Sequence, residues 1–281
     1  MKKKVIVISG PTASGKSALA VEEALRFGAE VIGADSRQLY RGMPVITAVP
    51  TLEERKGVPH RLVEVLEVEE YMSAALWCER ALEEIADVLL THEEAVVCGG
   101  SMLYIDALIR GLDDLPTVPD DIRLNTLEEF NEKGIAWARS ELERLDPVYY
   151  LQVDLNNGKR LIHAIELIRT AGKPYSAMRR GVRAERPFDI ELRLLQPERQ
   201  ELFRRINGRV EAMMEQGALA EAERLYPKRH LNSLNAVGFR ELFAYMEGRL
   251  SLDEAVARWQ RATRVYAKKQ LLWARHRSEE L

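Results

Sequence analysis

Cysteine is scarce in this chain, and long apolar runs are missing from it. The 281 residues include only Cys78 and Cys98, and neither has a Cys or His neighbour at the spacing of a metal site. A disulfide framework is therefore not expected, and a reducing cytoplasm is the expected location. No apolar run approaches the roughly 20 residues that span a bilayer. The short run at residues 5–8 does not suit a secretory signal and predicts a strand instead.

A large excess of charge of either sign is also missing, because 41 basic and 44 acidic residues leave a net charge of −3. Total charge therefore gives no argument for a nucleic-acid partner. The charge is unevenly placed, however. Basic residues dominate residues 159–186 and 258–277, whereas acidic residues gather in residues 53–94. This asymmetry permits a polyanionic partner without establishing one.

Short apolar runs alternate with helical patterns in the first part of the chain. Buried strands are predicted at residues 5–8, 30–34 and 95–98. Helices are predicted at residues 17–27, 73–91 and 102–110. An alternating stretch, residues 62–65, predicts an edge strand. This order of elements predicts an α/β fold with a parallel sheet flanked by helices.

The pattern changes at residue 113. Pro116 and Pro119 interrupt it, helical spacing then dominates to Thr170, and an alternating run at residues 188–195 returns to the sheet. The remainder of the chain is predicted to be helical. We therefore predict an α/β core with C-terminal helices, residues 1–112 and 187–281, interrupted by a helical insertion domain, residues 113–186.

The turn after the first predicted strand carries a phosphate-binding pattern. Gly10-x-x-x-x-Gly15-Lys16-Ser17 matches the Walker A motif in full. Its glycines let backbone N–H groups surround an anion, and the helix that follows adds its positive dipole end. Lys16 supplies a cation for the outer phosphate, and the Ser17 hydroxyl is placed to ligate Mg²⁺. The predicted phosphate-binding residues are Gly10, Thr12, Ala13, Ser14, Gly15, Lys16 and Ser17.

The pattern alone leaves the ligand open. P-loops most often serve ATP or GTP hydrolysis or kinases, which usually carry a second acid at the end of a neighbouring strand. The predicted strand at residues 95–98 ends without an acid, and the other candidate is Asp35, after residues 30–34. Asp35 either holds Mg²⁺ through water or acts as a base toward an acceptor substrate. Composition does not separate these two roles.

Four stretches of the chain resemble the tRNA dimethylallyltransferases, also called tRNA isopentenyltransferases. They are residues 10–17, Asp-Ser-Arg-Gln-Leu-Tyr-Arg-Gly-Met at 35–43, Gly-Gly-Ser-Met-Leu-Tyr at 99–104, and Thr-Arg-Val-Tyr-Ala-Lys-Lys-Gln-Leu-Leu-Trp at 263–273. Residues 58–60 and 237–242 also fall at family-like positions. The first stretch is generic, whereas the second and fourth are specific. The resemblance covers nearly the whole chain in the family's order, and it implies a P-loop core with a helical insertion domain.

The resemblance implies transfer of a dimethylallyl group from its diphosphate to the exocyclic amine of the adenosine just 3′ of the tRNA anticodon. The P-loop would then hold dimethylallyl diphosphate. Asp35 would take the proton of the amine. Lys16, Thr12, the loop N–H groups and Mg²⁺ would stabilise the leaving diphosphate. Arg205 and Arg209, one helical turn apart, match family positions and would reach the same phosphates.

The resemblance also implies contacts with the anticodon stem-loop, where a base must be unstacked before its edge reacts. The residues implied at the adenine are Asp35, Ser36, Arg37 and Gln38. Those implied along the rest of the tRNA are Ser101, Arg123, Lys159, Arg160, Leu161, Ile162 and His163. The chain departs from the family where Ile46 and Val49 replace a usual glycine and lysine, and where His163 replaces an arginine. None of these changes removes a residue that the transfer chemistry needs.

Three other functions compete with prenyl transfer to tRNA. They are prenyl transfer to free AMP, ADP or ATP, a P-loop small-molecule kinase, and RNA binding without catalysis. The helical insert and the basic stretch favour tRNA over a mononucleotide. The stretch that begins at Asp35 and the missing second acid argue against a kinase. RNA binding alone leaves the intact Lys16, Ser17 and Asp35 unexplained. We expect a monomer that does not associate with membranes.

Overall fold

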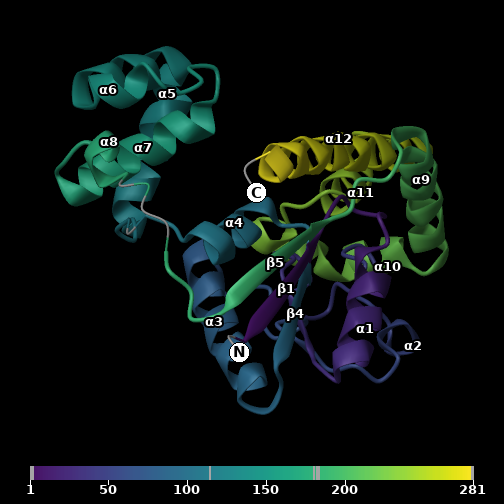
Figure 1. The fold of residues 1–281 in the computed structure, drawn as a ribbon. Helices are drawn as coiled ribbons and strands as arrows, with labels where there is room; N and C mark the ends of the chain where they lie inside the picture. Colours follow the sequence, from purple (N-terminus) through teal and green to yellow (C-terminus); the bar gives the residue numbers. More distant parts are fainter. Residues whose placement is uncertain (1–2, 114, 180, 182–183, 280–281) are drawn as a thin grey trace. The chain divides into compact units, whose positions relative to one another are not determined.

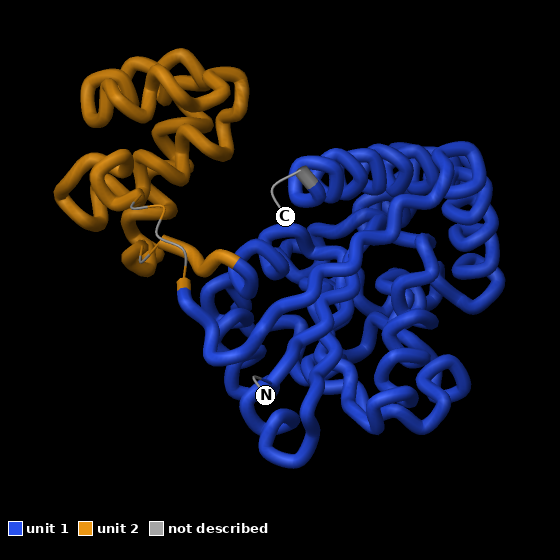
Figure 2. The backbone as a smooth tube through the Cα atoms, viewed as in Figure 1, with its two compact units in different colours: residues 1–109, 185–281 blue, residues 110–184 orange. Residues whose placement is uncertain are grey.

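The computed structural model describes residues 3–113, 115–179, 181 and 184–279. The chain divides into two compact units, a larger one of residues 1–109 and 185–281 and a smaller one of residues 110–184 (Figure 2). The smaller unit shares residues 113–184 with the insertion domain predicted from the sequence. Arg180 and Arg183, which belong to the basic stretch at residues 159–186, lie outside the described residues.

A sheet of five parallel strands forms the centre of the larger unit, in the order β3-β2-β4-β1-β5. Figure 1 shows its strands β4, β1 and β5 side by side. The strands are β1 (Lys4–Ser9), β2 (Val31–Gly33), β3 (His60–Arg61), β4 (Glu94–Gly99) and β5 (Asp189–Leu194). In the register of the sheet, Val7 lies opposite Val97 of β4 and Leu192 of β5. The predicted α/β fold with a parallel sheet is confirmed.

Helices cover the sheet and continue to the C-terminal end of the described chain. They are α1 (Lys16–Phe27), α2 (Leu52–Arg55), α3 (Ala74–Thr91), α4 (Met102–Arg110), α9 (Arg199–Glu215), α10 (Ala218–Leu225), α11 (Phe239–Met246) and α12 (Leu252–Glu279). Two 3₁₀ turns, η1 (Tyr226–Lys228) and η2 (Asn232–Leu234), connect α10 to α11. No helix in the described part of the chain is long and apolar enough to cross a membrane.

Different helices cover the two faces of the sheet, because successive side chains of a strand point to opposite sides. Val5 and Val7 of β1 belong to a buried cluster with side chains of α3, α4, α9, α10 and α11. Ile6 and Ile8 pack instead against α1. The helix after β1 and the helix after β4 therefore lie on opposite faces. Open α/β sheets bind ligands in the crevice between two neighbouring strands whose following helices lie on opposite faces of the sheet. Strands β1 and β4 form such a pair.

The edge strand of the sheet is not where the alternating pattern placed it. A strand is predicted at residues 62–65, whereas β3 ends before them. The backbone is left-handed at Leu62 and Glu64, with φ angles of 54° and 53°, and a strand cannot contain such residues. Leu62 and Val63 are nevertheless buried. The apolar residues of this stretch are therefore buried without forming a strand, and the strand prediction for these residues is wrong.

The smaller unit is a helical bundle with its own core. Its helices are α5 (Asp120–Leu145), α6 (Pro147–Tyr150), α7 (Gly158–Ala171) and α8 (Tyr175–Met178). Leu142 of α5 and Leu161 and Ile165 of α7 are fully buried at the centre of this unit. Helix α5 is kinked at Gly134, where φ is 74°. The predicted dominance of helix between residues 113 and 170 is confirmed.

A close approach between β4 and the end of β2 gives a stability prediction. A Cβ atom at Gly99 would lie 2.0 Å from the carbonyl oxygen of Ala34, so Gly99→Ala must separate two backbones. We expect this change to lower the unfolding free energy by about 1–3 kcal/mol, measured by urea denaturation. Gly208→Ala on α9 is the matched control, because the added methyl group would meet no described atom within 4 Å apart from its chain neighbours and the backbone of its own helix. The control should retain or slightly raise stability, by about 1 kcal/mol at most. Equal stability of the two variants would contradict the contact.

Candidate active site

A cavity of about 620 Å³ lies in the larger unit, and the turns after β1 and β2 contribute to its wall. Thr12 comes from the turn after β1, Lys16 begins α1, and Asp35 and Ser36 follow β2. The opposite walls are formed by α9, α12 and the loop at residues 46–48. The P-loop and the segment that begins at Asp35, which are separate in sequence, therefore share one cavity at the carboxyl edge of the sheet.

The P-loop holds hydrogen-bond donors that have no side-chain partner among the described residues. Helix α1 begins after Gly15 without a side-chain cap, so its first N–H groups have no side-chain acceptor. The Ser14 hydroxyl is buried and has no hydrogen-bond partner among the described residues. Ala13 adopts a left-handed conformation with φ of 62°, a strained backbone of the kind that gathers at functional sites. A polyatomic anion would satisfy these donors.

Lys16 is the cation nearest to these donors in sequence. Its Nζ atom lies 3.5 Å from the Pro11 carbonyl oxygen. Burial lowers the pKa of Lys16; the nearby Asp35 partly opposes this shift, whereas Arg209 adds to it. Burial also raises the pKa of the neighbouring Cys98 thiol to about 11, so this thiol is neutral at physiological pH. The ammonium group of Lys16 is therefore poorly hydrated, and an anionic ligand would replace the interactions with water that burial removes.

Asp35 is held in a tight turn at the end of β2. Its Oδ1 atom accepts the Arg37 N–H at 3.0 Å, and the Ser36 N–H donates to Ser101 Oγ at 2.8 Å. Tyr266 of α12 lies near this carboxylate. Burial raises the pKa of the Tyr266 hydroxyl to about 12, with the charge of Asp35 adding to the shift and Arg37 opposing it. A neutral phenol and a carboxylate are thus presented to the same cavity.

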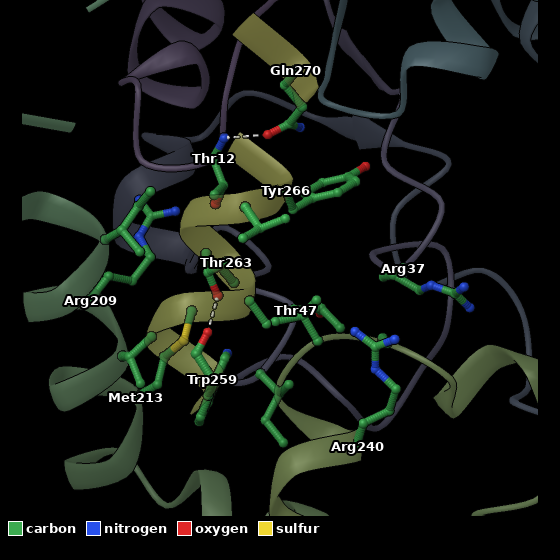
Figure 3. A pocket seen from close by; sticks show the side chains of 18 of the residues that line it. Thr12, Arg37, Thr47, Arg209, Met213, Arg240, Trp259, Thr263, Tyr266 and Gln270 are labelled. Carbon is green, nitrogen blue, oxygen red and sulfur yellow. Dashed lines mark hydrogen bonds between the residues drawn. The ribbon is translucent and has the colours of Figure 1, made fainter. Parts of the chain in front are cut away.

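One face of α12 forms a wall of the cavity. Trp259, Thr263, Tyr266 and Gln270 recur at intervals of four, three and four residues, which places them on one side of a helix. All four line the cavity, and Figure 3 shows them along the helix, with Gln270 bonded to the backbone of Thr12. The sequence placed three of them in a family motif without giving them a role. The spacing of the predicted helix was the signal that would have found them.

The loop at residues 45–48 is held in place from two sides. The buried Glu221 carboxylate of α10 accepts the N–H groups of Val45 and Ile46, each at 2.9 Å. Gln38 Nε2 donates to the carbonyl oxygens of the next two residues, at 3.0 and 2.7 Å. Burial raises the pKa of Glu221, and the two backbone bonds oppose this shift. Gln38 therefore shapes the cavity wall without lining it, and no local sequence signal pointed to Glu221.

The site residues expected from the sequence fall into two groups. Those that line the cavity are Thr12, Lys16, Asp35, Ser36, Arg37 and Arg209. Ser17 lies in the first turn of α1 and does not line it. Ser101 supports the turn through its bond to Ser36. Arg205 also lies outside the lining, and its guanidinium pairs with Glu201 at 2.8 Å.

Arg37 has a structural task in addition to its place in the cavity. Its Nη1 atom donates to the carbonyl oxygens of Asn232 and Ser233 at 2.8 and 2.9 Å. These bonds tie the turn after β2 to η2. Figure 3 shows the guanidinium groups of Arg37 and Arg240 on the same side of the cavity. Because Arg37 already has backbone partners, its contribution to ligand binding is limited to the remaining donors of its guanidinium.

Positive charge dominates the cavity. Its basic lining residues are Lys16, Arg37, Arg209, Arg240, Arg258, Arg261 and Lys269. Asp35 is the one acidic side chain among the described residues that line it. A concave surface with this imbalance attracts anions and raises their local concentration. Clusters of three or more His, Cys, Asp or Glu side chains that would hold a metal ion are absent from the described residues.

The residues expected at tRNA in the smaller unit differ in exposure. The exposed ones are Arg123, Lys159, Arg160 and His163. Ile162 is half-buried, and Leu161 is fully buried in the core between α5 and α7. The side chain of Leu161 therefore stabilises the helical unit and does not face solvent. Asn157 caps the N-terminus of α7, its side chain accepting the Arg160 N–H at 3.3 Å, which fixes the helix turn that carries Lys159 and Arg160.

The chain shares extensive sequence with known proteins. It is 46% identical to tRNA dimethylallyltransferase 2 of Parabacteroides distasonis, over 96% of this chain and 90% of that protein. It is 43% identical to tRNA dimethylallyltransferase 1 of Bacteroides thetaiotaomicron, over 99% of this chain and 90% of that protein. These identities extend through both compact units.

Solved structures share the fold. The tRNA isopentenylpyrophosphate transferase of Bacillus halodurans is 34% identical and superimposes with a TM-score of 0.70, covering 98% of this chain and 87% of that one. A eukaryotic dimethylallyltransferase acting on tRNA is 27% identical with a TM-score of 0.80, covering 96% of this chain and 69% of that one.

Residues 38–277 match the profile of the IPP transferase family. This range begins just after Arg37 and includes the whole smaller unit and the face of α12 that lines the cavity. The profile, the full-length relatives and the shared fold agree with the resemblance noted from the sequence. The chain belongs to the IPP transferase family.

Proposed function

We propose that this protein transfers a dimethylallyl group from dimethylallyl diphosphate to the exocyclic amine of the adenosine 3′-adjacent to the anticodon in tRNA. The observation that carries the proposal is one cavity lined by Asp35, Thr12, Lys16 and Arg209. It brings a candidate base to candidate diphosphate ligands. The relatives named tRNA dimethylallyltransferase support both substrates.

The reaction forms one C–N bond and breaks one C–O bond. The amine nitrogen attacks the first carbon of the dimethylallyl group, the diphosphate leaves with the electrons of the C–O bond, and the amine loses a proton. Asp35 accepts that proton, because an aromatic amine is a weak nucleophile that needs a base as the bond forms. The turn bonds to Arg37 and Ser101 hold the carboxylate at the cavity. This chemistry assigns Asp35 as the catalytic base.

The leaving diphosphate is stabilised by groups that are already arranged for it. Lys16 and Arg209 line the cavity, and the P-loop beside them holds the buried Ser14 hydroxyl and the uncapped N-terminus of α1. Fixed donors of this kind stabilise charge without reorganising during the reaction. Mg²⁺ fits a hydroxyl ligand with diphosphate oxygens and water, and Ser17 is the residue that would hold it. When bound, the ion would neutralise charge on the leaving group.

The dimethylallyl group is placed against the apolar part of the cavity. Ile206, Val210 and Met213 of α9 line it on one side, and Trp259 of α12 lines it on another. These side chains exclude water from an allylic carbon that carries positive charge as the C–O bond breaks. Ile46 lies beside Trp259 in this wall, because a Cβ atom at Gly238 would meet both side chains. A five-carbon apolar group matches this lining better than a nucleoside does.

The smaller unit is proposed to bind the tRNA backbone through the exposed residues at the start of α7. Replacing Lys159 and Arg160 with alanine should weaken tRNA binding and lower the slope of log affinity against log salt by about 1.5–2. Arg144→Ala is the matched control, because Arg144 is already paired with Glu141 at 2.9 Å. Binding measured by fluorescence anisotropy at several salt concentrations gives the slopes. An unchanged slope in the double variant would place α7 outside the interface.

A transfer assay with three acceptors tests the function. Labelled dimethylallyl diphosphate is incubated with unmodified tRNA, with AMP, or without acceptor, in the presence of Mg²⁺. We expect label on tRNA alone. Label on AMP and not on tRNA would replace the proposal with an adenylate prenyltransferase, and phosphate transfer from ATP would replace it with a kinase. The protein is proposed to act as a monomer in the cytoplasm, and light scattering of the purified protein tests the first of these.

A further inference from the structure

We infer that Gln270 is a positioning residue for the transfer reaction, because its side chain joins three separate parts of the site. The Thr12 N–H donates to Gln270 Oε1 at 3.0 Å, and Gln270 Nε2 donates to the Gly100 carbonyl oxygen at 2.8 Å (Figure 3 shows the first bond). One amide on α12 thus fastens this helix to the P-loop and to the turn after β4. The inference rests on the proposed function, in which Thr12 stabilises the leaving diphosphate.

The two bonds need the amide group specifically. Gln270 is only 3% exposed, so water does not substitute for either partner. The acceptor half of the side chain serves a backbone N–H, and the donor half serves a backbone carbonyl. An ionised carboxylate lacks the donor, a hydrocarbon lacks both halves, and an ammonium group lacks the acceptor. Glutamine is therefore matched to this place by its chemistry and not only by its size.

Gly100 leaves the space that this amide occupies. A Cβ atom at Gly100 would lie 2.5 Å from Gln270 Nε2, 3.5 Å from the Gly10 carbonyl oxygen and 3.6 Å from Lys16 Cε. The amide thus sits at the crevice between β1 and β4, within the same small volume as the Lys16 side chain. Displacing the amide alters the packing around the P-loop cation as well as the Thr12 backbone.

The consequence for the reaction follows from the position of Thr12. Its N–H points to α12, so its side chain is left on the cavity side, where it lines the wall. Without the Gln270 acceptor, the Thr12 peptide is free to rotate and its hydroxyl no longer has a fixed direction. An error of about 1 Å in a group that stabilises a transition state costs about 100-fold in rate. Gln270 therefore acts on turnover through Thr12 and not by touching substrate.

Two variants test this role. Gln270→Met removes both bonds at similar volume and leaves the Thr12 N–H and the Gly100 carbonyl without this partner, so the thermal unfolding midpoint should fall. We expect kcat per folded molecule to fall about 100-fold as well, while KM for dimethylallyl diphosphate changes little. A purely structural role would lower the midpoint and leave kcat per folded molecule unchanged. That second outcome would overturn the inference.

The pH dependence of a second variant, Gln270→Glu, distinguishes loss of the two hydrogen bonds from loss of packing. A protonated carboxyl group both donates to Gly100 and accepts from Thr12, as the amide does, whereas the ionised form repels the Gly100 carbonyl. The charged or titratable groups around this place are Lys16 of α1, Asp35 after β2, Cys98 of β4 and Asp106 of α4, which bonds Trp273 one turn along α12. We expect the activity of this variant relative to the wild type to be high at acid pH and to fall as pH rises.

The wild-type protein in the same tRNA transfer assay separates the two claims. Absence of transfer by the wild type would contradict the proposed function. Transfer by the wild type, together with full turnover of Gln270→Met or a pH-independent ratio for Gln270→Glu, would contradict the role of Gln270 and leave the function standing.

Discussion

Asp35→Asn is expected to lower the rate of prenyl transfer by about 10³-fold, within the range that general-base catalysis contributes. The asparagine retains an oxygen that can accept the Arg37 N–H, so the turn after β2 should keep its shape. It cannot take the proton of the attacking amine. Binding of dimethylallyl diphosphate should survive, because the diphosphate donors belong to the P-loop and α9. Single-turnover transfer and equilibrium binding by calorimetry measure the two effects separately.

The control for this change is Glu22→Gln, which removes an exposed carboxylate from α1 of the same unit. It should leave both transfer and binding at wild-type values. If Asp35→Asn loses diphosphate binding together with transfer, the carboxylate organises the metal and diphosphate, and the role of base is wrong. If it keeps full transfer, Asp35 has no part in the chemistry.

Removal of the Lys16 charge is expected to have the next largest effect. Lys16→Met should reduce kcat by about 10²–10³-fold, the usual cost of one lost donor to a developing anion. Burial lowers the pKa of Lys16, so the free enzyme loses this cation at a lower pH than an ordinary lysine would. The value of kcat/KM for dimethylallyl diphosphate should accordingly fall as pH rises through that pKa, since this ratio reports groups of the free enzyme.

Lys16→Arg distinguishes this titration from others. An arginine stays charged at any pH in the assay, so the alkaline fall in kcat/KM should move to higher pH even if the absolute rate is lower. Tyr266 and Cys98, whose pKa values are raised to about 12 and 11, remain present in this variant. An alkaline limb that stays in place would therefore assign the fall to another group and contradict the role of Lys16.

The P-loop and its partner acid could be predicted from sequence because both rest on short local patterns. A strand, a glycine-rich turn and a helix are fixed by residues close in the chain, and Asp35 lies two residues after the end of the buried strand β2. The edge strand could not be predicted, because the alternating apolar residues at 62–65 are buried on a backbone that turns left-handed. A buried loop and a paired strand both give alternating apolar residues in the sequence, so the pattern at residues 62–65 does not distinguish them.

The contacts that support the site could not be predicted from local patterns, because they join residues that are far apart in the sequence. Gln270 is separated from Thr12 by 258 positions, and Glu221 from Val45 by 176. No spacing rule connects such pairs, because the fold alone brings them together. Arg205 lies one turn from Arg209 on α9, yet only Arg209 lines the cavity, and the Arg205 guanidinium pairs with Glu201. Helical spacing alone does not distinguish these two side chains, and contact of Arg205 with the diphosphate stays a prediction.

The most direct test of the proposed function is the identity of the nucleoside that receives the prenyl group. Unmodified tRNA is reacted with dimethylallyl diphosphate and the protein, then digested to nucleosides and fragments for mass spectrometry. We expect a single dimethylallyl group on the exocyclic amine of the adenosine immediately 3′ of the anticodon, and none with Asp35→Asn in the same time. A prenyl group on another nucleoside, or none on tRNA under conditions where AMP is prenylated, would contradict it.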